Sequence, residues 1–130
     1  MKILILDPDW RFGGQTRRYF ESLAHLVVLQ SHTNDAIRKI DRWQPDLVVV
    51  AAELAQDGLL EHLHTGEHRP AVLLTGWMDR YDRVWRAWQK GGHELLMKPV
   101  FNTEEIHQAT IKALENAVAG TRTPQVAASA

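Results

Sequence analysis

Three polar side chains that could share one site each lie at the end of a short apolar run. Asp7 follows the first such run, Thr75 ends the fourth, and Lys98 follows the fifth. Lys98 could anchor an anion beside the Thr75 hydroxyl, or it could pair with Asp7, which is the simpler expectation. Asp9 directly precedes Trp10 and is suited to cap a helix that starts there.

Other groupings that would suggest catalysis or metal binding lack the required spacing. The Gly13-Gly14 pair has neither the lysine nor the spacing of a nucleotide-binding loop. His62 and His64 are two residues apart, so a helix would turn them to different faces. No serine, histidine and acid set has the context of a hydrolase. We therefore expect neither an enzyme nor a metal site.

The order of the predicted elements indicates an α/β fold. Five short runs rich in Val, Ile and Leu alternate with stretches whose apolar residues recur every three or four positions, which is typical of a parallel sheet covered by helices. The predicted strands are 3–6, 25–29, 47–51, 71–75 and 95–97. The predicted helices are 10–23, 34–43, 58–64, 79–90 and 103–118, with Asn34 and Thr103 as N-caps of the second and the last.

Composition narrows the class of protein. The 130 residues fit one domain, which we place at 1–118, followed by a small and polar tail at 119–130 that we expect to be flexible. Fifteen basic and sixteen acidic side chains give a formal charge of −1, so direct binding to nucleic acid is not expected. The chain has no cysteine and no apolar run near the roughly 20 residues of a membrane span, which predicts a cytoplasmic protein.

The residues at the strand ends resemble those of the receiver domain of bacterial response regulators, over about residues 2–118. The match includes Lys-Ile-Leu-Ile-Leu-Asp at 2–7, Pro-Asp-Leu-Val-Val-Val at 45–50, Leu-Leu-Thr at 73–75 and Gly-Gly-His-Glu-Leu-Leu-Met-Lys-Pro at 91–99. This resemblance implies a doubly wound, five-stranded parallel sheet of the flavodoxin-like or CheY-like kind, with strand order 2-1-3-4-5. It also implies a role in two-component signal transduction. Carried over position by position, it retains Asp7, Thr75, Lys98 and a cis peptide before Pro99.

Two departures remove the chemistry of that family. Receivers carry a phosphoacceptor aspartate at the end of the third strand and a second acid after the first, where this chain has Ala51 and Pro8. A methyl group cannot attack phosphorus, and one carboxylate is a weak magnesium site because magnesium requires near-octahedral oxygen ligation. We therefore expect no phosphorylation and no cofactor. Phosphotransfer to a displaced acid, Glu53 or Asp9, is the remaining enzymatic alternative.

Glu53 and Leu95 mark two further differences from receivers. Glu53 could place a permanent carboxylate beside Lys98 and mimic the activated charge, although an exposed loop acid is the simpler interpretation. Leu95 stands where the family has a switch aromatic, three residues before the lysine, so Thr75 lacks its usual partner. The two-state element that the resemblance would supply is therefore missing.

The most unusual enrichment is aromatic and lies around the predicted fourth helix. On a helical wheel its small residues face the sheet, which leaves Tyr81, Trp85 and Trp88 at the edge or in solvent. Arginines at 80, 83 and 86 surround them, and this composition is that of an interface hot spot. Together with Leu95, these three aromatic residues form the predicted interface.

These observations favour a non-enzymatic, phosphorylation-independent pseudo-receiver that acts by protein–protein interaction. The resemblance implies a histidine kinase or a separate effector as partner, or a homodimer formed through helix four, strand five and helix five. The alternative is a small-ligand or anion sensor that uses the vacated pocket. The residues of this vestigial pocket are Asp7, Pro8, Asp9, Ala51, Glu53, Thr75, Lys98 and Pro99.

Overall fold

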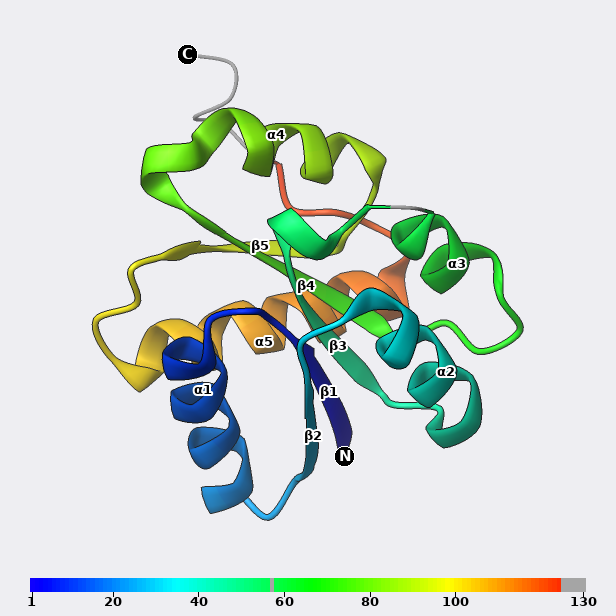
Figure 1. Cartoon of the computed structure of the whole chain (residues 1–130), viewed down its shortest axis with the longest axis horizontal. Coiled ribbons are helices and arrows are strands. Elements are labelled where there is room, and N and C mark those ends of the chain that lie inside the picture. The colour runs from blue at the N-terminus through cyan, green and yellow to red at the C-terminus, as the bar shows by residue number, and fades with distance from the viewer. Residues whose placement is uncertain (57, 125–130) are drawn as a thin grey trace.

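A five-stranded parallel sheet lies between two layers of helices in the computed structural model, which describes residues 1–56 and 58–124 (Figure 1). In spatial order the strands are β2 (Leu26–Gln30), β1 (Lys2–Leu6), β3 (Leu47–Ala51), β4 (Ala71–Trp77) and β5 (Glu94–Lys98). The predicted doubly wound α/β class and the strand order 2-1-3-4-5 are confirmed. In the part of the chain that is described, no helix has the length and apolar character needed to cross a membrane.

The helices cover both faces of the sheet. One face carries α1 (Trp10–Ser22) and α5 (Thr103–Ala119), and the other carries α2 (Thr33–Trp43), α3 (Leu59–Thr65) and α4 (Tyr81–Lys90) (Figure 1). Alternate residues of β1 serve the two layers, since Ile3 and Ile5 pack with α1 and α5 while Leu4 and Leu6 pack on the opposite side. Short 3₁₀ helices follow β3 and β4, namely η1 (Ala52–Leu54) and η2 (Met78–Arg80).

Helix starts were predicted with mixed success. Asp9 caps α1 as expected, because its carboxylate accepts hydrogen bonds from two amides of the first turn, the nearer at 3.0 Å. The cap of α5 is Asn102 and not Thr103, since Asn102 and Glu105 form a reciprocal capping box. The second helix begins one residue before Asn34, so Asn34 is not its cap.

Residues 119–124 pack against the fold. The Arg122 guanidinium lies 4.0 Å from the centre of a ring of Trp88 and donates to the Gly92 carbonyl at 2.7 Å. Arg122 also donates to the carbonyl of Trp88. The described part of the segment that we expected to be flexible thus contacts the domain through Arg122, and residues 125–130 lie outside the described residues.

Two histidines lie beside this segment and accept hydrogen bonds from backbone amides. Nδ1 of His93 accepts from the Val72 amide at 2.9 Å, and Nε2 of His64 accepts from the Gly92 amide at 3.2 Å. A ring nitrogen that accepts a hydrogen bond carries no proton, so this arrangement fits neutral rings. Burial lowers the pKa of both histidines below the ordinary 6.5, and repulsion from nearby cationic groups, Arg122 among them, lowers the pKa further.

Acidification is expected to weaken the fold through these two histidines. Each of them binds a proton near pH 6.5 in the unfolded chain but only at lower pH in the folded one, so the free energy of unfolding falls as the pH drops through 6.5 toward the folded-state pKa. Urea titrations at a series of pH values measure this slope. His93→Gln keeps an acceptor for the Val72 amide and is expected to flatten the slope. His32→Gln makes the same substitution at an exposed ring and controls for the effect of the substitution itself on stability. A slope in His93→Gln as steep as that of the native chain contradicts the prediction.

Candidate functional site

The carboxyl ends of the strands bring four predicted site residues to one edge of the sheet (Figure 1). Asp7 directly follows β1, Lys98 ends β5, and Ala51 at the end of β3 pairs in register with Thr75 of β4. All four are buried, with exposed fractions of 3% for Asp7, 1% for Lys98 and 0% for the other two. The predicted residues therefore do come together, but they form a closed cluster.

Lys98 and Asp7 form a buried ion pair. The Lys98 Nζ donates to Oδ2 of Asp7 at 2.6 Å, and each side chain is 1% exposed. Oδ1 of Asp7 accepts from the Asp9 amide at 2.8 Å. The ammonium also lies 4.3 Å from the centre of the Phe12 ring and 5.4 Å from that of Trp77, within the range of cation–π attraction. The simpler of the two roles expected for Lys98 is thus present, with aromatic walls that sequence reasoning missed.

The electrostatics of the pair are set by burial. Burial raises the pKa of Asp7 above the ordinary 3.8, while the charge and the hydrogen bond of Lys98 oppose that effect. Repulsion from Glu53 raises the same pKa slightly further. Both carboxylate oxygens of Asp7 have a donor, so the pair is satisfied internally and needs no ligand.

The residues at this edge do not fit a magnesium ion. Pro8 has no side-chain oxygen, and both carboxylate oxygens of Asp7 already accept hydrogen bonds. The Asp9 carboxylate accepts hydrogen bonds from amides in the first turn of α1. Across residues 1–56 and 58–124, no group of three or more His, Cys, Asp or Glu is arranged to hold a metal ion.

The acceptor position and its hydroxyl neighbour are sealed. Ala51 presents a buried methyl group where receivers have an aspartate, and Oγ1 of Thr75 is buried without a hydrogen-bond partner. Such an unpaired hydroxyl costs about 1–3 kcal/mol. The peptide between Lys98 and Pro99 is cis, as the resemblance implies. Because Asp7, Thr75 and Lys98 expose so little surface, the alternative of an anion sensor at these residues loses its geometric basis.

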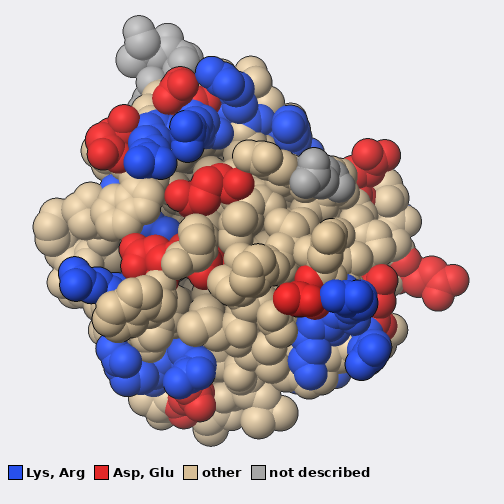
Figure 2. All heavy atoms as spheres, viewed as in Figure 1, with Lys and Arg blue, Asp and Glu red and all other residues tan. Residues whose placement is uncertain are grey.

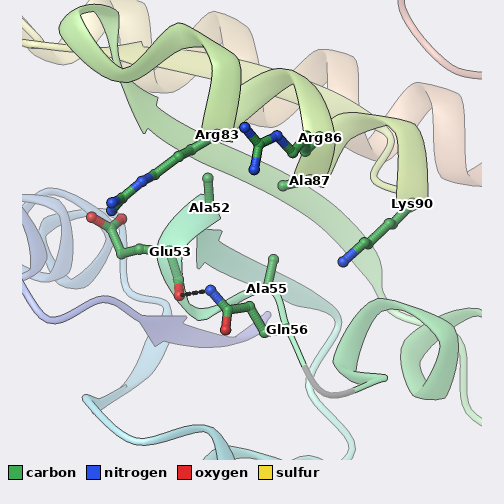
Figure 3. A pocket seen from close by; sticks show the side chains of 8 residues that line it. All are labelled: Ala52, Glu53, Ala55, Gln56, Arg83, Arg86, Ala87 and Lys90. Carbon is green, nitrogen blue, oxygen red and sulfur yellow. Dashed lines mark hydrogen bonds between the residues drawn. The ribbon is translucent and has the colours of Figure 1, made fainter.

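Glu53 lines a hollow of about 540 Å³ between η1 and α4 (Figure 3). Its carboxylate points toward the Arg83 guanidinium, and the Gln56 side-chain amide donates to its carbonyl at 3.1 Å. Among the described residues, no salt bridge joins Glu53 to Lys98, whose ammonium is held by Asp7. The structure therefore places Glu53 at the entrance of this hollow and not in an ion pair with Lys98.

The residues of the predicted interface divide between surface and core. Tyr81 is 37% exposed, and Trp85 and Leu95 are partly buried against the core on the α4 side of the sheet. Trp88 is only 5% exposed and belongs to that core. Arg122, from the segment after α5, lies over the ring, so Trp88 offers little surface to a partner in this structure.

Three other large apolar side chains are exposed at the carboxyl edge, and sequence reasoning missed them. Trp10 after β1 is 73% exposed, Met78 after β4 is 64% exposed, and Phe101 after β5 is 81% exposed. Their positions after strands can be read from the sequence, but their exposure depends on how each loop leaves the sheet. They lie after strand ends at the same edge of the sheet as the buried cluster.

The five-stranded parallel sheet with strand order 2-1-3-4-5, covered by helices on both faces, is the receiver fold. The signal receiver domain of a modulated diguanylate cyclase from Desulfovibrio desulfuricans is 22% identical, with a TM-score of 0.75 over 92% of this chain and 97% of that one. A response regulator receiver domain protein from Clostridium thermocellum is 19% identical, with a TM-score of 0.74 over 91% and 97%. NtrX from Brucella abortus, in complex with ADP, is 18% identical, with a TM-score of 0.79 over 92% of this chain and 27% of that one.

Among curated proteins, the chain is similar to the Regulator of RpoS of Escherichia coli and of Shigella flexneri. Each is 24% identical over 117 residues, which make up 87% of this chain and 34% of the relative. The chain therefore spans about a third of the length of these relatives. No family model matches the sequence.

Proposed function

We propose that this chain is a pseudo-receiver, a non-enzymatic module with the receiver fold that signals by binding other proteins without being phosphorylated. The observation that carries the proposal is the buried methyl group of Ala51 beside a lysine that Asp7 already neutralises at 2.6 Å. Phosphotransfer needs a nucleophile and a cation free to meet the phosphoryl group. Ala51 supplies no nucleophile, and the Lys98 ammonium is enclosed.

Exposed apolar side chains support a contact function. Trp10, Met78, Tyr81 and Phe101 expose between 37% and 81% of their surface and follow strand ends at the same edge. Exposed apolar and aromatic groups of this kind are enriched where proteins bind one another. The partner that this function requires is a histidine kinase, a separate effector or a second copy bound through α4, β5 and α5. The interaction would take place in the cytoplasm.

Incubation with acetyl phosphate and magnesium is expected to leave the intact mass of the chain unchanged, because no acceptor carboxylate occupies the end of β3. Mass spectrometry of the whole protein measures this directly. The matched control is the Pro8→Asp, Ala51→Asp double variant, which restores both missing acids and is expected to gain one phosphoryl group. A mass gain in the unaltered chain would overturn the proposal, and peptide mapping would then distinguish Glu53 from Asp9 as the acceptor.

A further inference from the structure

A groove runs along α4, and its opposite wall is lined by described residues of η1, by residues of α3 and by positions 55, 56 and 58 between them (Figure 3). It consists of two adjoining hollows of about 540 and 510 Å³, which share Ala55, Gln56 and Lys90. The first hollow is polar and is lined by basic residues of α4. The second is largely apolar and includes Leu59 and Leu60 of α3. The groove thus offers a charged half and an apolar half in one continuous surface.

The charged half is cationic. Arg83, Arg86 and Lys90 are spaced by three and four residues, so they form one stripe along the α4 wall. Figure 2 shows Lys and Arg side chains gathered over this helix. Arg86 is 3.3 Å from Asp82 and Arg83 faces the Glu53 carboxylate (Figure 3), whereas Lys90 forms no salt bridge with a described residue. Among the described residues that line the first hollow, Glu53 supplies the one carboxylate opposite these three cations.

The shape of the groove is set by backbone and small side chains. Ala52, Ala55 and Ala87 line the first hollow and are all buried, so room is left above them. The helix is held in place because β4 has Gly76 at the contact, where a Cβ would overlap the Val84 side chain. The α4 wall of the groove is therefore closely packed against the sheet.

We propose that this groove binds an acidic segment of a partner protein. The carboxylates of that segment lie against Arg83, Arg86 and Lys90, and an aliphatic side chain packs in the second hollow, where Thr65 and the methylene stem of Lys90 are exposed above the buried Leu59 and Leu60. The inference rests on the proposed function, because it names the surface through which the module contacts its partner. Both hollows are open to solvent, which suits an extended chain better than a small ligand, since small-ligand sites enclose most of their ligand. An apolar half and an overall formal charge of −1 do not suit nucleic acid.

A titration of the isotope-labelled chain with a synthetic peptide tests the proposal. The probe is Gly-Glu-Glu-Leu-Glu-Glu-Leu-Gly, and the readout is the shift of backbone amide resonances. Saturable shifts are expected along η1, α3 and α4. The Arg83→Glu, Lys90→Glu pair is expected to weaken binding by about tenfold or more. The matched control is the Arg17→Glu, Arg18→Glu pair on α1, which makes the same charge change in the other helix layer, and a peptide with Gln in place of Glu should not bind.

Three results would overturn the groove as an acidic-segment site. They are equal weakening by the two charge-reversal pairs, shifts that do not map to the groove, and displacement of the peptide by inorganic phosphate or a short RNA at lower concentration. Urea midpoints of each variant verify that it is folded. If the peptide does not bind and acetyl phosphate leaves the mass of the chain unchanged, the groove proposal is contradicted but the pseudo-receiver proposal stands. If the peptide binds and the chain gains a phosphoryl group, the reverse holds.

Discussion

Replacing Lys98 with alanine is expected to lower the free energy of unfolding by about 3–5 kcal/mol, the usual effect of removing one partner from a buried ion pair. The pair with Asp7 is 2.6 Å long and each side chain is 1% exposed, so the variant leaves a buried carboxylate without its charge partner. It also removes the ammonium from the faces of Phe12 and Trp77. Urea unfolding near neutral pH measures the loss.

Two controls separate the charge effect from a general effect of mutation. The Asp7→Asn, Lys98→Met double variant removes both charges and is expected to regain most of the lost stability, because neither ion is left buried alone. Arg17→Ala breaks a pair with Glu21 that is 3.2 Å long but about half exposed, and it is expected to cost at most about 1 kcal/mol. Equal losses in Arg17→Ala and Lys98→Ala would contradict the special role of the buried pair.

The pH dependence of Lys98→Ala gives an independent check. Burial raises the pKa of Asp7 and Lys98 opposes that rise, so removing Lys98 raises the pKa further. The folded variant then binds a proton at a pH where the unfolded chain does not, and its free energy of unfolding recovers as the pH falls toward the ordinary 3.8. The difference between native chain and variant should therefore shrink in acid. Histidine effects are common to both chains and cancel in this difference.

The fold could be predicted largely because buried strands and amphipathic helices differ in the period of their apolar residues. The run at 47–51 is apolar throughout, as a strand covered on both faces requires, and β3 has those same bounds. Ends of elements were harder to predict. Asn102 and Thr103 both make good N-caps, and only the reciprocal contact of Asn102 with Glu105 decides between them.

The sequence predicted which residues meet at the candidate site but not which side chains enclose them. Parallel strands end at one edge, so Asp7 and Lys98 had to lie near each other. Nothing in the sequence shows that the first turn of α1 brings Phe12 over the ammonium, or that Trp77 closes a second side. The groove had no sequence signal either, because its second wall depends on the path of the segment after Ala51.

Trp88 shows where reasoning from one helix fails. A helical wheel of α4 places Trp88 near the edge of the buried face, which is correct for the helix taken alone. The ring is buried because Arg122, which lies 34 positions later, packs over it and bonds to the backbone around it. Coverage by a distant segment leaves no trace in local periodicity, and a predicted boundary at residue 118 had placed that segment outside the domain.

Trp88→Ala is accordingly expected to lower the free energy of unfolding by about 3–5 kcal/mol, the range for removing a large aromatic side chain from a core. The ring is 5% exposed and packs within the core on the α4 side of the sheet. Trp85→Ala is the matched comparison, since it makes the same change on the same helix at a partly exposed position, and it is expected to cost less. Urea unfolding of both variants provides the measurement.

The same experiment decides whether Trp88 belongs to the core or to an interface. An interface residue would lose partner binding with stability unchanged, whereas a core residue loses stability first. Arg122→Ala is expected to cost about 1–2 kcal/mol, through the lost cation–π contact and hydrogen bonds. A chain that ends at residue 118 should lose at least as much. Because Trp88 supports α4 from its sheet side, its loss should also weaken binding of the peptide along Arg83, Arg86 and Lys90. If Trp88→Ala is as stable as the native chain, the assignment of the ring to the core is contradicted.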